Sequence, residues 1–130
     1  MQKNIHLLAI VLLISITSVI AQSTTKPWPE MKYFHHFIST TFHPSEEGNL
    51  LPLKEKADSM YIAVKQWHAS AIPADYKIEE TKKALHKILE KCLEIKNNVA
   101  KKADDEKLKK LIFECHNIFH AIAKECRKEE

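Results

Sequence analysis

Glycine is almost absent from this chain, with Gly48 the only one in 130 residues. Phosphate-binding loops and dinucleotide-binding folds need several glycines, because their turns adopt positive φ and let the backbone approach the ligand closely. The CXXCH motif of covalent haem attachment is also missing. So is the HEXXH motif of zinc proteases, since the residues between His116 and His120 read NIF and include no glutamate. These absences exclude glycine-loop enzymes, c-type cytochromes and HEXXH proteases.

An excess of one charge is missing too, because 20 Lys and Arg residues stand against 17 Asp and Glu residues. Nucleic-acid binders and polybasic membrane binders depend on clustered positive charge. The nearly balanced charge therefore argues against both classes. We expect no nucleic-acid partner.

The first 21 residues, MQKNIHLLAIVLLISITSVIA, have the pattern of a secretory signal peptide. Lys3 precedes an apolar run over residues 5–20, and small residues precede the expected cleavage after Ala21. The alternative is a permanent membrane anchor, but the run is shorter than the roughly 20 residues that a spanning helix needs. We expect residues 1–21 to be removed. Residues 22–130 would then form one secreted or periplasmic domain without a stable membrane anchor.

Prolines divide the remaining chain, because proline is tolerated in the first turn of a helix and disfavoured inside one. A first helix is expected over residues 28–42, ending before Pro44. Loops are expected at residues 43–49, 71–76 and 97–105. No strand-like alternation competes with this pattern. The sequence predicts an all-α fold, an up-down-up-down antiparallel bundle of four helices.

The last two helices carry apolar residues at the heptad-like spacing of helices packed nearly parallel in a bundle. In the third helix the predicted core stripe consists of Ile78, Thr81, Leu85, Ile88, Cys92, Ile95 and Val99. In the fourth it consists of Leu108, Leu111, Cys115, Ile118 and Ile122. Asp104 or Asp105 is expected to cap the fourth helix.

Three histidines are candidate metal ligands. At 100° per residue, His35 is expected to face inward with the core of the first helix, and His36 to lie on the surface. His116 and His120 lie one turn apart on the flank of the last helix, which faces the first helix in an up-down bundle. Three imidazoles from two neighbouring helices would suit copper, zinc, nickel or iron. The alternative is that all three are ordinary surface histidines.

The first loop adds an imidazole and two carboxylates, from His43, Glu46 and Glu47. These side chains could bind a second ion, or they could stabilise the start of the second helix. Carboxylates favour helix N-termini through the helix dipole, so the second interpretation is preferred.

The exported part contains an odd number of cysteines, Cys92, Cys115 and Cys126. If the last turn centres near residue 103, Cys92 and Cys115 come to the same level on their core stripes. An oxidising compartment favours a disulfide between them. The alternative is two buried free thiols. Cys126 is then left as a metal ligand, an inert thiol or a bridge to a second chain in a dimer.

The chain resembles the cytochrome b562 family of exported four-helix bundles, through Met31 in the first helix and NIFHAIAKECR in the last. The resemblance implies a non-covalent haem b ligated by Met31 and His120, with Asn117 and Phe119 matching the residues before the family's histidine. It implies electron transfer as the function. The segments TFHPSEEGN and CHNIFHAI are also similar to small exported proteins of Bacteroidetes type, a likeness that implies no chemistry.

Together these features predict an exported bundle that binds haem or a transition-metal ion between its first and last helices. Its role would be electron transfer or metal handling with a redox or metal-transfer partner. The alternative is a structural or protein-interaction bundle without a cofactor. The sequence has no recognisable set of nucleophile, base and oxyanion donors, so an enzyme is not expected.

Overall fold

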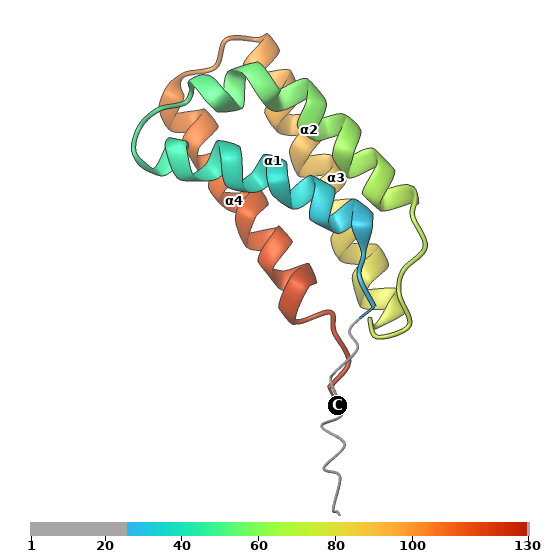
Figure 1. The fold of residues 1–130 in the computed structure, drawn as a ribbon. Coiled ribbons are helices and arrows are strands. Elements are labelled where there is room, and N and C mark those ends of the chain that lie inside the picture. Colours follow the sequence, from blue (N-terminus) through green and yellow to red (C-terminus); the bar gives the residue numbers. More distant parts are fainter. Residues whose placement is uncertain (1–25, 130) are drawn as a thin grey trace, which may run out of the picture.

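The computed structural model describes residues 26–129, which form the helices α1 (Pro29–Glu46), α2 (Leu51–Ala69), α3 (Ile78–Ala100) and α4 (Asp105–Lys124) (Figure 1). Within that range no strand forms, and the β pairing is limited to an isolated bridge between Tyr76 and Arg127. The prediction of an all-α fold with four helices is confirmed. The expected signal peptide at residues 1–21 lies outside the described residues.

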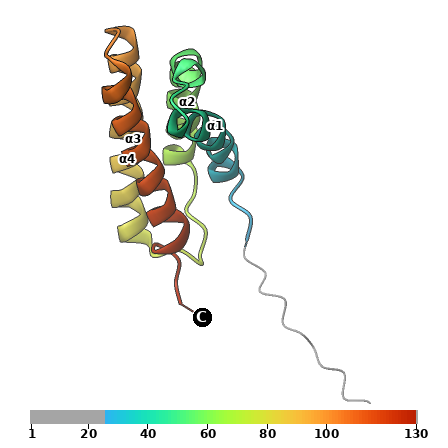
Figure 2. The ribbon, with the colours of Figure 1, turned by 90° about the vertical axis from the view of Figure 1, so that its left-hand side faces the viewer.

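The four helices pack in a ring of neighbours. Helix α1 contacts α2, α2 contacts α3, α3 contacts α4, and α4 returns to α1. Figure 2 shows α3 and α4 as one layer and α1 and α2 as the other. Each helix turns one face towards its neighbours, so the buried side chains of all four helices meet in one core. None of these helices is long and apolar enough to cross a membrane.

The core follows the predicted stripes on α3 and α4, with differences at their edges. The buried residues of α3 are Thr81, Leu85, Ile88, Cys92 and Ile95. Those of α4 are Leu108, Leu111, Ile112, Cys115, Phe119 and Ile122. Ile78 is 50% exposed and Val99 is only partly buried, because both lie in the terminal turns of α3. On α4, Phe119 takes the buried position expected for Ile118, which is partly covered.

Helix α1 is longer than predicted, because Pro44 lies inside it rather than after it. A proline removes only its own N–H from the helix, and this one lies in the last turn, where few further bonds are lost. The hydroxyl of Ser45 donates to the carbonyl of Thr41 (2.7 Å), and the N–H of Asn49 donates to the carbonyl of Pro44 (2.9 Å). The chain then turns at Gly48, whose φ of 88° favours glycine. The expected loop at residues 43–49 therefore shrinks to the residues between α1 and α2.

The cap predicted for α4 is present. The Asp104 carboxylate accepts a hydrogen bond from the N–H of Lys107 at 2.8 Å and so satisfies one of the free amides at the helix start. Helix α3 extends through Ala100, so the asparagines at 97 and 98, which we expected in a loop, are helical. Asparagine is only mildly unfavourable in a helix, and the Asn98 amide donates to the carbonyl of Glu94 (2.8 Å).

The segment after α4 closes one end of the bundle against the connection between α2 and α3. The N–H of Lys77 donates to the carbonyl of Cys126 (2.7 Å), and the N–H of Lys128 donates to the carbonyl of Asp75 (2.9 Å). Between these bonds Tyr76 is fully buried. Residues 126–128 thereby become part of the fold.

Candidate functional site

His116 and His120 form a pair on one face of α4. Their Nε2 atoms lie 3.0 Å apart, and their ring planes are 77° apart. His116 is partly buried and His120 is exposed. The four-residue spacing places the two rings one turn apart on one side of the helix, as predicted.

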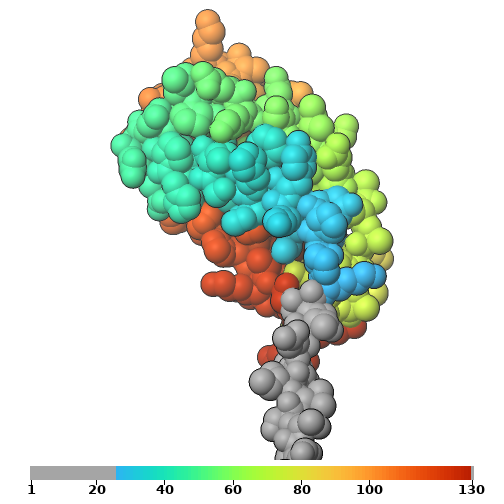
Figure 3. Space-filling view, in the orientation of Figure 1, coloured from blue at the N-terminus to red at the C-terminus, as the bar shows by residue number. Residues whose placement is uncertain are grey.

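An aromatic side chain from α1 holds His116 in place. The ring of Phe42 stacks on the His116 ring with centroids 3.7 Å apart and planes 6° apart. Helix α4 borders α1 along the face shown in Figure 3. The contact with Phe42 places His116 where these two helices meet. Among the described aromatic contacts His120 has no stacking partner in α1, so α1 holds only His116 in this way.

The pKa of His116 lies below its ordinary value of 6.5. Burial is the main cause, because it disfavours the charged imidazolium, and the nearby His120 lowers the pKa further. The neutral form that metal ions require is therefore favoured at neutral pH. The Nδ1 atom of His116 is buried and has no hydrogen-bond partner in the described structure.

His35 does not face inward, so that prediction is wrong. Phe34 and Ile38 form the buried face of α1, and the intervening His35 is exposed. Its ring stacks on Phe119 of α4 at a centroid distance of 5.0 Å. The Phe119 ring in turn lies 5.8 Å from the His120 ring, so His35 and His120 both border the same phenyl ring.

Met31 and the residues around His43 have other partners. The hydroxyl of Tyr76 donates to the sulfur of Met31 at 3.8 Å. His43 Nδ1 lies 3.1 Å from Glu46 Oε2, and both side chains belong to the last turn of α1 instead of a loop. The first amide of α2 is satisfied by Asn49, whose side-chain oxygen accepts from the N–H of Leu51. Across residues 26–129, no group of three or more His, Cys, Asp or Glu side chains could hold a metal ion.

Cys92 and Cys115 lie side by side as predicted, at the contact between α3 and α4, but the disulfide expected between them is not formed in the described structure. Their sulfur atoms lie 3.7 Å apart, both are fully buried, and both are free thiols. Burial raises the pKa of Cys92 well above its ordinary value, and Cys115 adds to the shift. Cys126 is also buried, with 6% of its surface exposed, so a bridge to a second chain would require the segment after α4 to open.

Two features of the surroundings were not predicted from the sequence. One is the stacking of Phe42 on His116, and the other is a group of aromatic rings around Trp67 that includes Trp28, Phe34 and Phe119. The four-residue spacing of Ile38 and Phe42 on the buried face of α1 is the signal that could have placed the Phe42 ring opposite α4.

No family model, curated protein or solved structure matches this chain.

Proposed function

We propose that this protein is an exported helical bundle that binds a transition-metal ion through His116 and His120, for metal handling or electron transfer. The observation that carries the proposal is the 3.0 Å separation between the two Nε2 atoms. Two nitrogens that bind one ion at about 2.0–2.1 Å are about 2.9 Å apart at a right angle and about 3.4 Å apart at the tetrahedral angle. The pair therefore has the spacing of a chelating site.

The same spacing fits a hydrogen bond between one protonated and one bare Nε2 in the absence of metal. A metal ion would replace that proton, so binding would release a proton or move it to Nδ1. When the metal ion is bound to Nε2, Nδ1 of His116 carries the hydrogen. No acceptor for this N–H is present in the described structure, so we expect a lower affinity for the metal ion. A site of this kind suits an ion that is picked up and passed on.

A complete site needs further ligands. We propose His35 as the third imidazole, reaching the pair through a change of rotamer past Phe119, with water or a partner protein supplying the rest. Copper, zinc, nickel and iron all accept imidazole ligands. Copper is favoured among divalent ions at a given nitrogen site, so it is the first ion to test.

The haem hypothesis, with Met31 and His120 as ligands, rests on the resemblance to the cytochrome b562 family. In this arrangement the Met31 sulfur accepts a hydrogen bond from Tyr76, and His120 is paired with His116. A haem ligated by both would require both side chains to leave these partners, so the residues present do not fit haem in their current positions. We place the bare metal ion ahead of haem for that reason.

We also propose that the helices run up-down-up-down in antiparallel order. Contacts between successive helices, together with connections of only a few residues, support this topology.

We also propose that the protein is not an enzyme. The competing function is a structural or interaction bundle, and the lack of a three-ligand group within residues 26–129 favours it.

The test is elemental analysis combined with an absorption spectrum of natively purified protein. We expect bound copper, zinc, nickel or iron, and its loss in His120→Ala but not in the exposed α1 variant His36→Ala. A Soret band would indicate haem instead. Metal content that is the same in His120→Ala and the parent protein would rule out the proposed site.

A further inference from the structure

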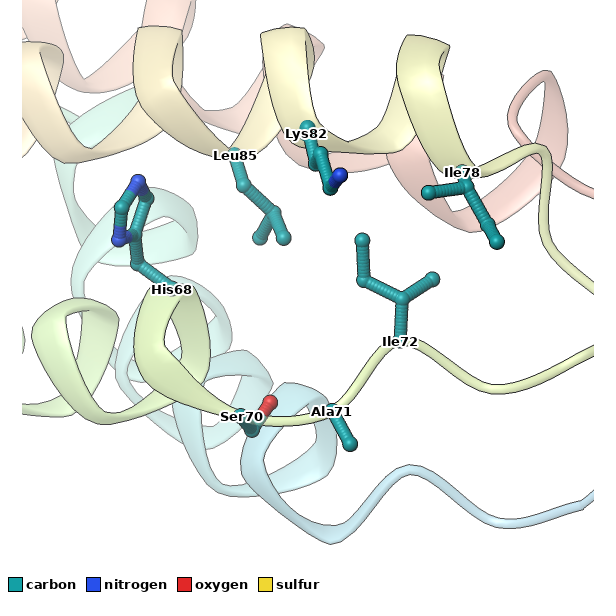
Figure 4. Close-up of a pocket in the computed structure, with 7 residues that line it drawn as sticks. All are labelled: His68, Ser70, Ala71, Ile72, Ile78, Lys82 and Leu85. Carbon is teal, nitrogen blue, oxygen red and sulfur yellow. The ribbon is translucent and has the colours of Figure 1, made fainter.

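We propose that a pocket between the end of α2 and the start of α3 binds a small organic acid with an apolar hydrocarbon body and a carboxylate head. The cavity has a volume of about 600 Å³ and is partly open to solvent. Figure 4 shows Ile72 of the α2–α3 connection pointing toward Lys82 and Leu85 of α3, with His68 of α2 beside them and Ala71 turned away. Pockets for small ligands have volumes of about 300–1,000 Å³.

The body of the pocket is apolar. Ile72, Ile78 and Leu85 supply most of its lining, with Ala71 beside them. Leu85 is almost fully buried and fixes the floor, whereas Ile78 is 50% exposed and leaves apolar surface in contact with water. A hydrocarbon chain that covered Ile72 and Ile78 would remove this surface from water, which is the main source of affinity in such pockets.

The polar groups of the pocket are few, and its permanently charged side chain is positive. Lys82 is the one permanently charged side chain among the lining residues that the structure describes, and His68 is the other titratable one. The Nζ atom of Lys82 lies 3.3 Å from Oε1 of Glu79, and both side chains are mostly exposed. Because exposed ion pairs are weak, a ligand carboxylate can compete with Glu79 for Lys82. The Ser70 hydroxyl is already engaged, because it donates to the carbonyl of Trp67 and accepts from the Trp28 indole.

The surface next to the pocket extends the positive charge along α3. A neighbouring hollow is lined by Lys82, Lys83, His86 and Lys87, with Glu90 as its carboxylate. An anionic head group that enters beside Lys82 therefore meets an environment of complementary charge. An apolar floor with a cationic rim selects an amphipathic anion over a neutral or cationic molecule of the same shape.

The experiment is a titration of ¹⁵N-labelled protein with octanoate, followed through backbone amide shifts. Octan-1-ol and octylammonium serve as matched neutral and cationic probes. We expect octanoate to shift the amides of residues 68–85 with a dissociation constant of roughly millimolar, as a small open pocket implies, and to bind more tightly than either other probe.

The variant Lys82→Gln should bind octanoate about three- to tenfold more weakly while its affinity for octan-1-ol is unchanged. Lys124→Gln, an exposed substitution on α4, is the control and should behave like the parent protein. The proposal is overturned if octanoate leaves residues 68–85 unshifted, if octylammonium binds as well as octanoate, or if Lys82→Gln binds octanoate like the parent. None of these variants involves the histidine pair, so the result is independent of the metal proposal.

Discussion

His116 couples the histidine pair to the stability of the fold. Its pKa lies below 6.5 in the folded chain, mainly because of burial and then because of His120. The unfolded chain takes up a proton near the ordinary value, whereas the folded chain takes it up only at lower pH. Between the lowered pKa of folded His116 and the ordinary value of 6.5, the unfolded state therefore binds more protons than the folded state. The stability contributed by neutral His116 is present above pH 6.5 and is lost as the pH falls through the lowered pKa.

Replacing His116 by glutamine should reduce this loss. We predict that the decrease in urea midpoint between about pH 7.5 and about pH 5 becomes smaller in His116→Gln than in the parent protein, because glutamine does not titrate. The control is His36→Gln on the exposed face of α1, whose decrease should match the parent. An equal decrease in all three proteins would mean that His116 is not linked to folding in this way.

At the scale of the helices, the contact between α3 and α4 carries the buried thiol pair. The sulfurs of Cys92 and Cys115 are 3.7 Å apart, so only a small movement separates the thiols from a disulfide. Burial and the raised pKa of Cys92 keep it protonated, and the thiolate is the form that attacks a disulfide oxidant. Oxidation of the folded protein should therefore be slow.

We predict that oxidised glutathione, acting as the electron acceptor, converts Cys92 and Cys115 to a disulfide with the loss of two hydrogens from the protein. The bond closes a loop of about 24 residues and should raise the free energy of unfolding by about 3 kcal/mol. Peptide mapping by mass spectrometry would locate it, with Cys126→Ser unaffected and Cys115→Ser unable to form it. A disulfide that involves Cys126 in the parent protein would contradict the prediction.

Local signals explain which helix boundaries could be predicted. The Asp104 cap and the proline in the first turn of α2 act within a few residues, so the sequence displays them directly. The end of α1 could not be predicted in the same way. A proline usually ends a helix, but α1 continues past Pro44 to Glu46, and the hydrogen bonds of Ser45 and Asn49 stabilise this last turn.

The positions of the histidines could also be predicted only in part from the sequence. Spacing alone correctly placed His116 and His120 on one side of α4. The orientation of His35 depends on how α1 is rotated against its neighbours, and Phe34, one residue earlier, takes the buried position. The pocket beside Lys82 depends on the path of the α2–α3 connection, which no periodic pattern describes.

At the scale of the whole molecule, Phe34 links three helices. Its ring from α1 lies 5.3 Å from Trp67 of α2 and 6.2 Å from Phe119 of α4, measured between centroids, and it is fully buried. Removing it would leave a cavity at the point where the layers meet, lined by rings that cannot easily close it.

We predict that Phe34→Ala lowers the free energy of unfolding by about 3–5 kcal/mol, measured by urea denaturation. The adjacent Tyr33 is 53% exposed, so Tyr33→Ala is the matched control and should cost well under half as much. Similar losses in both variants would show that the core is not organised around Phe34.

The central claim is that the bundle holds a metal ion through two histidines of α4, and a copper titration tests it most directly. Isothermal calorimetry with metal-free protein at neutral pH should give one Cu²⁺ per chain. Binding should be at least about tenfold weaker in His116→Ala and in His120→Ala, because each loses one of two chelating nitrogens. His36→Ala should bind like the parent protein. Equal copper affinity in the parent, His116→Ala and His120→Ala would contradict the claim.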